Sequence, residues 1–378
     1  MCVIFMKKKA ALFLLLSLLI ILTGCSQKVA TEKSTRSSAE LVKTTDYSDY
    51  NTQEKNLEHF IKQKLVTKKG IYTNYSKQKY IESEARGHEM LSESSGLWLE
   101  HLAYTHQYKA FRNFYKQTKA TFDQGNQFSY RYVPAKNKKF SVNATLDDLR
   151  IIKALQMYSQ LTKDKSYHQE AVTRFAKLQK HTMQRGKIAS FYDTSAHKAS
   201  TDSALPYYDL LTLRYFESGT KASKKMYRQQ LTVVQDGFLG DAFPLYATTY
   251  NWQSKSYSKD NLNTSEALET LLHLSEVGKV KKVSLNWLTR QVKNNTLYNA
   301  YTNTGGIVDS GHSAGSYALA AEIFATNGNQ KMYHQAMNLV WKYQISDKSS
   351  PMYGAIGLEQ KKEAYSYNNL NALIASQY

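Results

Sequence analysis

Cysteine is nearly absent from this sequence of 378 residues, which contains only Cys2 and Cys25. Two cysteines can supply neither a disulfide framework nor a Cys-based zinc site. The fold must therefore be held together by a hydrophobic core. Hydrophobic residues make up 42% of the chain, which is ample material for one large domain of this length.

The motifs of two large enzyme classes are also missing. The sequence contains no phosphate-binding glycine loop and no His-Glu-x-x-His pair, which argues against a nucleotide-dependent enzyme and a zinc protease. The ten histidines are scattered along the chain. We therefore expect no cofactor and no metal ion.

Proline is scarce, with four residues in the chain, and this favours long helices. Apolar residues recur at helical spacing in many stretches. The pattern predicts about twelve helices, which lie near residues 57–65, 84–104, 109–122, 146–155, 166–184, 203–217, 221–235, 263–277, 282–293, 312–326, 329–344 and 366–376. Residues 128–133 and 243–250 alternate with aromatics instead and predict short strands on long loops.

Twelve helices in one domain indicate paired helices, arranged either as an open array or as a closed ring. The sequence has no repeat of fixed period, which argues against an array. We therefore predict an all-α fold over residues 49–378, an (α/α)6 toroid of about six helical hairpins with short strands on the cleft-side loops. Such a ring gathers its loops at one end, where a cleft can hold a chain-like ligand.

The beginning of the chain has the order of an export signal. A basic stub, Lys7 to Lys9, precedes an apolar run over residues 10–22, and Leu-Thr-Gly-Cys follows, ending at Cys25. The run is too short to span a bilayer, which needs about 20 apolar residues. Because the last four residues form a lipobox, we predict a signal peptide over 1–24 and a lipid on Cys25; an ordinary signal peptide that ends in cysteine is the alternative.

Residues 26–48 are mostly Ser, Thr, Lys, Glu and Ala, a composition that buries too little surface to offset chain entropy. We expect a flexible tether over 25–48, with the domain held at the outer face of the cell membrane.

The net charge of the chain is +19, and removal of the first 24 residues leaves +16. A basic balance of this size is typical of nucleic-acid binding, but outside the cell acidic wall polymers, anionic lipids or an anionic exopolysaccharide are better partners. A solvated basic surface explains the charge equally well. We expect no nucleic-acid partner and a monomer.

Three segments place carboxylates where a loop meets a helix or a strand. They are residues 80–90, 143–149 and 239–246. Each has an ordinary explanation, because acids in a first helical turn complement the helix dipole and an Asp after Gly is common in turns.

Taken together and in this order, on a ring of helices, these segments resemble glycoside hydrolase family 8. The resemblance is nearest to the lipoprotein hydrolases encoded with Gram-positive exopolysaccharide operons. The first motif of that family carries the general acid, and Ser83, Glu84 and Met90 match it. The second carries a substrate-binding carboxylate, and Ala144, Thr145 and Asp148 match it, with Asp147 as the substitute. The third is matched by Pro206 and Tyr208, and the fourth, with the general base, by Asp241, Ala242 and Tyr246.

Several positions depart from the family pattern. Ala85, Arg86, His88 and Glu89 replace four usual residues around the acid, Leu146 stands where an Asp is expected, and Pro244 replaces an Arg. These differences argue against cellulose and chitosan as substrates and favour the producer's own exopolysaccharide.

The resemblance implies an inverting glycosidase, endo-acting on an extracellular polysaccharide. Glu84 would donate a proton to the leaving oxygen and Asp241 would activate water, with the two carboxyl groups about 6.5–9.5 Å apart. Arg86 should point at the substrate, because near Glu84 it would oppose protonation. Aromatic residues would stack on sugar rings, and the candidates are Trp98, Tyr130, Tyr132, Tyr208, Trp252 and Tyr301. Tyr246, from the fourth motif, is a further expected substrate-binding residue.

Two other functions stay open. A polysaccharide lyase would use a Tyr or His base and Arg side chains that neutralise a uronate, which suits the basic charge. A sugar-binding lipoprotein without activity would explain the departures from the motifs.

Overall fold

The computed structural model describes residues 41–43 and 45–378. Cys25, the expected signal peptide and most of the expected tether lie outside these residues. Among the residues described, no helix is long and apolar enough to cross a membrane.

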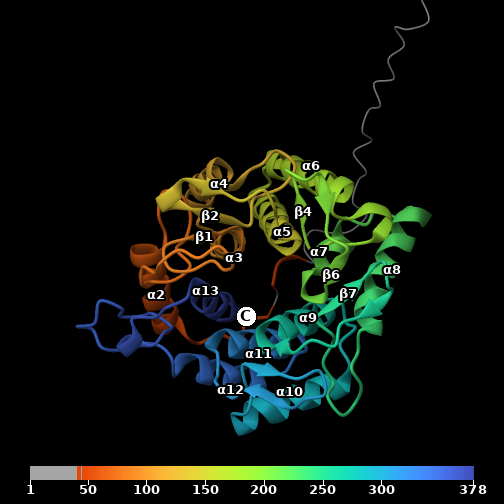
Figure 1. The fold of residues 1–378 in the computed structure, drawn as a ribbon. Coiled ribbons are helices and arrows are strands. Elements are labelled where there is room, and N and C mark those ends of the chain that lie inside the picture. Colours follow the sequence, from red (N-terminus) through yellow and green to blue (C-terminus); the bar gives the residue numbers. More distant parts are fainter. Residues whose placement is uncertain (1–40, 44) are drawn as a thin grey trace, which may run out of the picture. The chain divides into compact units, whose positions relative to one another are not determined.

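In the described residues, twelve α-helices form two concentric rings, an inner and an outer one (Figure 1). The inner helices are α3 (Ser92–Tyr104), α5 (Thr145–Thr162), α7 (Leu210–Tyr215), α9 (Thr264–Glu276), α11 (Ala314–Thr326) and α13 (Ser366–Ala375). The outer helices are α4 (Tyr108–Phe122), α6 (Lys165–His181), α8 (Lys221–Asp236), α10 (Lys282–Asn294), α12 (Gln330–Trp341) and α2 (Asn51–Phe60), which a π-helical turn (Ile61–Leu65) extends. The predicted (α/α)6 toroid is therefore confirmed.

The two rings differ in sequence because they differ in burial. In α11 every residue from Ala314 to Ala325 is buried, and small side chains let its neighbours approach closely. In α4, by contrast, the buried residues Phe111, Phe114, Tyr115 and Thr118 lie on one face and lysines occupy the other. This amphipathic spacing is the one expected of a helix with one solvent face.

The ring is closed by the two ends of the domain. The first helix, α2, packs against the last, α13, and the loop before α3 is hydrogen-bonded to the loop before α13, from Tyr75 N to Ala364 O and from Ser366 N to Thr73 O. This closure makes the sixth hairpin from segments that lie 300 residues apart in the sequence.

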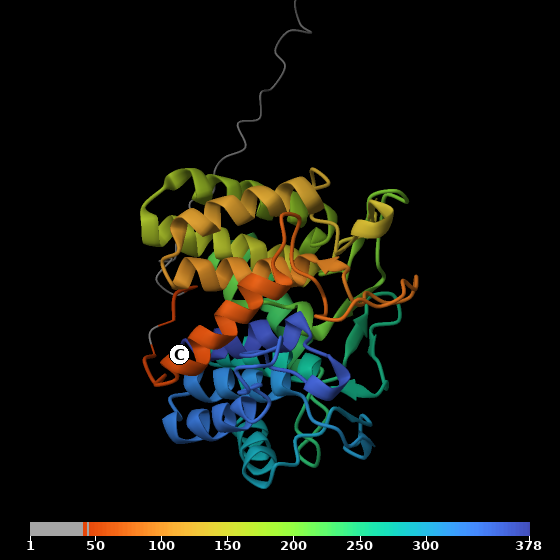
Figure 2. The ribbon, with the colours of Figure 1, turned by 90° about the vertical axis from the view of Figure 1, so that its left-hand side faces the viewer.

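Short antiparallel strands lie at one end of the toroid, on the right of Figure 2, and precede the inner helices. Three sheets have three strands and one has two. The strands are β1 (Met90–Leu91), β2 (Arg131–Val133), β3 (Lys138–Lys139), β4 (Tyr192–Asp193), β5 (Lys198–Ala199), β6 (Asp202–Ala204), β7 (Thr249–Asn251), β8 (Ser256–Tyr257), β9 (Leu262–Asn263), β10 (Ala300–Tyr301) and β11 (Ile307–Asp309). The predicted strand region 128–133 contains β2, and the region 243–250 overlaps the first two residues of β7.

The opposite end of the toroid is closed by the start of the domain. Leu41 is buried, the Lys43 ammonium donates to Ile374 O (3.1 Å) and lies 4.1 Å from the Tyr378 ring, and Tyr47 N donates to Tyr378 O (2.7 Å). These residues were expected in the flexible tether. The structure corrects that boundary, because their apolar and cationic side chains fill the end of the ring.

One predicted helix starts in the wrong place. The periodicity predicts a helix from residue 84, but α3 begins at Ser92 and residues 81–89 form a loop. Gly87 adopts a left-handed φ of +57°, and a Cβ there would collide with the backbone of Gln78. This loop shifts the first motif out of the helix, with consequences for the site.

Candidate active site

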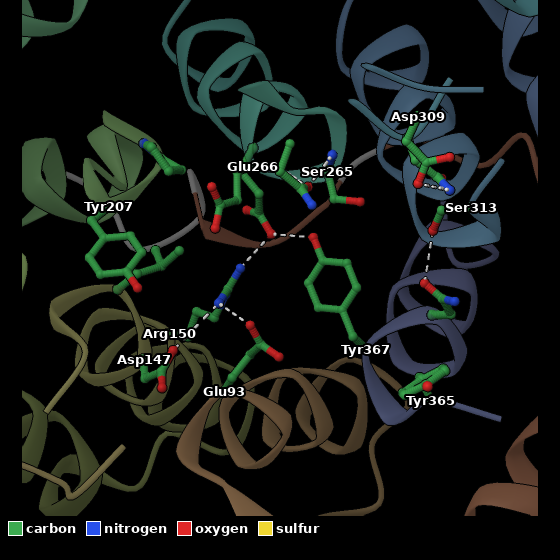
Figure 3. A pocket seen from close by; sticks show the side chains of 16 residues that line it. Glu93, Asp147, Arg150, Tyr207, Ser265, Glu266, Asp309, Ser313, Tyr365 and Tyr367 are labelled. Carbon is green, nitrogen blue, oxygen red and sulfur yellow. Dashed lines mark hydrogen bonds and ion pairs between the residues drawn. The ribbon is translucent and has the colours of Figure 1, made fainter. Parts of the chain in front are cut away.

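A cavity of about 490 Å³ opens at the strand-bearing end of the toroid. All six inner helices contribute to it through their first turn or the residues just before it (Figure 3). The lining residues are Glu93, Leu146, Asp147, Arg150, Pro206, Tyr207, Asn263, Ser265, Glu266, Glu269, Asn299, Asp309, Ser313, Tyr365, Tyr367 and Asn368. Helix N-termini carry partial positive charge, which favours the carboxylates gathered there.

Arg150 organises the floor of the cavity. Its Nη2 lies 2.5 Å from Glu269 Oε1, and its Nη1 lies 3.8 Å from Glu93 Oε2 and 3.6 Å from Asp147 Oδ1. Tyr367 also donates its hydroxyl to Glu269 Oε1 (3.3 Å). One buried guanidinium therefore fixes three carboxylates that come from α3, α5 and α9.

Gly96 allows Arg150 to reach this position. The glycine lies in α3, one turn after Glu93, and a Cβ built on it would lie 2.8 Å from the Cβ of Arg150 on α5. Only glycine lets the two inner helices approach this closely. The close packing of α3 on α5 sets the spacing between Glu93 and Arg150.

The surroundings of Glu93 favour its neutral form. Burial raises the pKa of the Glu93 carboxyl to about 8, against the opposing effect of Arg150 and with help from the negative charges of Asp147, Glu269 and Glu266. Burial likewise raises the pKa of Asp147 to about 6, while Arg150 and a hydrogen bond from Ser92 Oγ (2.7 Å) act in the other direction. At neutral pH the cavity thus holds a protonated acid beside an ionised one.

Glu266 faces Glu93 from the other side of the ring, because α3 and α9 are three hairpins apart (Figures 1 and 3). It lies in the first turn of α9 and is exposed to the cavity. Desolvation within the cavity, together with the nearby Glu269, raises the pKa of Glu266. Unlike Glu269, Glu266 forms no ion pair with the residues that the structure describes.

The expected catalytic pair lies outside this cavity. The Glu84 side chain is 57% exposed on the loop before α3 and pairs with Arg86 at 2.9 Å. Asp241 is exposed in the turn between α8 and β7. We correct both assignments, because neither carboxyl lines the cavity. We also correct the expectation that Arg86 points at a substrate, because Arg86 pairs with Glu84 outside the cavity.

The second motif is split between two roles. Asp147 lines the cavity, as expected of a substrate-binding carboxylate. Asp148 points elsewhere: its oxygens accept hydrogen bonds from Phe128 N (2.9 Å) and Asn143 Nδ2 (2.8 Å). Asp148 therefore fastens a loop to the start of α5 and does not line the cavity.

Most aromatic candidates belong to the core. Tyr208 is fully buried and shares a hydrogen bond with Ser203 Oγ (2.8 Å), and Trp98 and Tyr246 are 3% and 2% exposed. None of the six predicted stacking residues, which also included Tyr130, Tyr132, Trp252 and Tyr301, lines the cavity, and neither does Tyr246. The cavity instead uses Tyr207, Tyr365 and Tyr367.

Glu93 and Glu266, which were not predicted as site residues, occur in short motifs like those around Glu84 and Asp241. Ser92-Glu93 repeats Ser83-Glu84 nine residues later, and Glu266-Ala267 repeats the acid–alanine pair of Asp241-Ala242. A second signal is the spacing of ionisable residues in α9, where Glu266, Glu269, His273 and Glu276 form one stripe in an otherwise apolar helix. Such a stripe on a buried helix points to the axis of the ring.

The pentapeptide Gly311-His312-Ser313-Ala314-Gly315 has the spacing of a serine-hydrolase nucleophile elbow, which the sequence analysis did not use. Ser313 lines the cavity, but its Oγ donates to Asn368 Oδ1 (3.0 Å), and His312 Nδ1 lies 3.0 Å from Leu297 O. Neither contact is a serine–histidine pair, so the pentapeptide does not have the geometry of a catalytic triad.

Asp209, His273 and Glu276 approach one another within 4.8 Å below the cavity, a spacing compatible with a metal ion. A cation already occupies this region, because Lys153 Nζ lies 3.6 Å from Glu276 and 3.4 Å from Glu100. Asp209 accepts hydrogen bonds from Thr212 N and Oγ1. These contacts account for the cluster as an internal ion-pair network.

No family model matches the chain. A protein of Bacillus subtilis (strain 168) named "Putative lipoprotein YdaJ" is 27% identical over 331 residues, or 85% of each chain. Among solved structures, a novel alpha-amylase from Clostridium perfringens is 26% identical with a TM-score of 0.80, covering 89% of this chain and 99% of its own.

Two more distant structures share the fold. PssZ from Listeria monocytogenes has a TM-score of 0.64 at 17% identity and covers 89% of this chain and 97% of its own. Endoglucanase Cel10, a family 8 glycosyl hydrolase from Klebsiella pneumoniae, has a TM-score of 0.60 at 15% identity and covers 85% and 97%. These likenesses show that the chain shares its fold with a family 8 glycosyl hydrolase.

Proposed function

We propose that this protein is a glycoside hydrolase that cleaves a polysaccharide with inversion of configuration, with Glu93 as general acid and Glu266 as general base. The observation that carries the proposal is the gathering of Glu93, Asp147 and Glu266 in one cavity, where burial raises the pKa of Glu93 to about 8. Glycosidic cleavage needs this combination of one neutral and one charged carboxyl group.

Each residue of the cavity has a role in this chemistry. Glu93 donates its proton to the leaving glycosidic oxygen, and Glu266 takes a proton from the attacking water on the opposite side of the sugar. Glu269 is held by Arg150 and Tyr367, which makes it a positioning residue rather than a base. Asp147 shares Arg150 with Glu93 and is placed to bind the sugar on the same side as the acid.

Relatives support the reaction class. Two of the similar structures are named as an alpha-amylase and a family 8 endoglucanase. Both names describe enzymes that act on glycosidic bonds of polysaccharides. The cavity of this chain, open at the end of the ring and lined by Tyr207, Tyr365 and Tyr367, offers aromatic faces to sugar rings.

The lyase alternative is disfavoured by charge. The cavity is lined by Glu93, Asp147, Glu266, Glu269 and Asp309 against the single cation Arg150. A uronate would meet these carboxylates without the cations that an elimination needs to neutralise it. The substrate segment bound here is therefore a glycan without a negative charge at the cleaved unit.

We further propose that the enzyme acts outside the cell, held by a lipid on Cys25, and that its substrate is the producer's own exopolysaccharide. The lipobox that ends at Cys25 supports the anchor, as does the name of the Bacillus relative, which describes a lipoprotein. An endo mode of cleavage, with a role in polysaccharide turnover or biofilm release, follows from the same proposal.

The substitution Glu93→Gln tests the mechanism. It keeps the shape of the side chain but removes the proton donor, so release of reducing ends from the polysaccharide should fall by about 10²–10⁴-fold. Binding and the thermal unfolding midpoint should stay near the parent values. The matched control is Glu84→Gln, an exposed acid outside the cavity, which should keep the parent rate.

The result also separates the enzyme from a sugar-binding protein. If the parent protein binds the polysaccharide but releases no reducing ends, the non-catalytic alternative holds. If Glu84→Gln loses activity and Glu93→Gln keeps it, the site proposed here is wrong.

A further inference from the structure

Charge is segregated between the two rings of the toroid. The six outer helices carry 17 Lys and Arg residues against four Asp and Glu, whereas the six inner helices carry eight acidic residues against three basic ones. The excess positive charge therefore lies on the circumference of the ring, away from the acidic cavity.

The densest basic stripe is on α4. Lys109, Arg112, Lys116 and Lys119 are all exposed, and their spacing of three and four residues puts them on one face of the helix. The helix contains no acidic residue. A stripe of four like charges repels itself, at a cost that a bound counter-charge would relieve.

A groove of about 370 Å³ runs beside this stripe, between α4 and α6. It is lined by Arg112, Tyr115, Lys116, Lys119, Ser166, Tyr167 and Glu170. It therefore combines three cations, a half-buried tyrosine face and a hydroxyl group. This chemistry suits an anionic chain whose backbone lies in the recess.

The one acid in the groove is largely neutralised from within the protein. Glu170 Oε1 accepts from the Tyr115 hydroxyl (2.6 Å) and from Arg174 Nε (2.9 Å), while Lys119 Nζ is more distant at 3.8 Å. Neither Arg112 nor Lys116 forms an ion pair with any residue in the described part of the chain. Their charges are therefore directed to solvent and to a ligand.

We propose that the α4–α6 groove binds a polyanionic chain, with phosphate or carboxylate groups along it, at a site separate from the catalytic cavity. A polymer fits better than a membrane, since Arg112, Lys116 and Lys119 line a recess between α4 and α6 that a chain can enter and a flat bilayer surface cannot. The acidic cavity repels the same chain, so it is held by the groove without being drawn into the active site.

The test measures binding of two polyanions, inorganic polyphosphate and polygalacturonate, to the purified protein. The groove variant is Lys116→Gln with Lys119→Gln, which keeps Arg112 because it also donates to the Tyr158 hydroxyl (2.8 Å). The matched control is Lys224→Gln with Lys225→Gln, two exposed lysines of α8. Both variants lose two positive charges on an outer helix.

The groove variant should bind at least one of the polymers about tenfold more weakly at low salt, since two partly screened charge contacts are lost. The α8 control should stay within about twofold of the parent, because its lysines lie outside the groove. The polymer that shows this difference identifies phosphate or carboxylate as the recognised group. Cleavage of the uncharged substrate should be the same in all three proteins.

Three outcomes would overturn the proposal. Equal weakening in both variants would mean diffuse attraction by net charge alone, and binding of neither polymer would remove the site. The third is a groove variant that loses binding to vesicles of phosphatidylglycerol and phosphatidylcholine but retains both polymers, since that would make the stripe a membrane contact. Each outcome leaves the catalytic proposal standing.

Discussion

The pH dependence of hydrolysis reports directly on Glu93. Because the general acid must be protonated and its pKa is raised to about 8, kcat/KM should be maintained below that pH until Glu266, the general base, becomes protonated. Above it the protonated fraction falls, so the rate should drop about five- to sixfold between pH 8 and pH 9 and about tenfold with each further unit. A carboxyl of ordinary pKa would lose its proton near pH 4 and would leave no alkaline limb here.

The substitution Asp147→Asn shifts this limb in a defined direction. Glu93 and Asp147 lie 3.8 and 3.6 Å from the same Arg150 nitrogen, so their nearest oxygens are at most about 7 Å apart. With an effective dielectric constant of roughly 20–40, a like charge at that distance is worth about 1–2 kcal/mol, or about one pH unit or slightly more. Its removal lowers the pKa of Glu93 and moves the limb to lower pH.

The assay is the initial rate of reducing-end release from pH 5 to 10, fitted as kcat/KM. Since Glu93 and Asp147 titrate as an interacting pair, the midpoint belongs to the pair in the parent and to Glu93 alone in the variant. The control Glu84→Gln, far from the cavity, should leave the midpoint unchanged. An alkaline limb that is absent, or that stays in place in Asp147→Asn, would refute the assignment of Glu93.

Two further predictions concern the base and the packing of the site. Glu266→Gln should lower kcat for reducing-end release by about 10²–10⁴-fold, while Asp241→Asn keeps the parent rate. Equal rates in the two variants would exclude Glu266 as the general base. Gly96→Ala should lower the free energy of unfolding, measured by chemical denaturation, by about 1–2 kcal/mol. Overpacking against Arg150 outweighs the gain in helix propensity of about 1 kcal/mol. A variant more stable than the parent would contradict the close approach of α3 and α5.

The architecture could be predicted because periodicity is a property of each helix alone. Eight predicted helices reappear with ends shifted by at most three residues, for example 221–235 as Lys221–Asp236. The exceptions are instructive. The helix predicted over 203–217 shortens to Leu210–Tyr215, because Pro206 sits in a separate 3₁₀ turn (Leu205–Tyr207).

The type of the proposed catalytic residues, a pair of carboxylic acids, could be predicted from the sequence, but their positions could not. Ser-Glu occurs at positions 83–84, 92–93, 265–266 and 275–276, and acid–alanine at 84–85, 170–171, 241–242, 266–267 and 363–364, so motif letters alone do not choose between them. The choice depends on which acid sits at the first turn of an inner helix. That requires knowing where α3 begins, which is set by the loop around Gly87 and not by helical periodicity.

The position of the Lys43 ammonium at the far end of the ring could not be predicted from the sequence either. Lys43 looks like a tether lysine in the sequence, yet it is half-buried next to Tyr378, with Glu322 and Glu100 nearby. Burial lowers the pKa of Lys43 while these acids raise it. Such long-range pairing comes from ring closure, and nothing in the local sequence encodes it.

The most direct test of the central claim is a structure of the Glu93→Gln variant with an oligosaccharide of its polysaccharide bound across the cavity. The account predicts that the side chain at position 93 lies within about 3 Å of a glycosidic oxygen, and that a water between the anomeric carbon and Glu266 is bonded to that carboxylate. An oligosaccharide bound instead beside Glu84 or Asp241, with the cavity left empty, would contradict it.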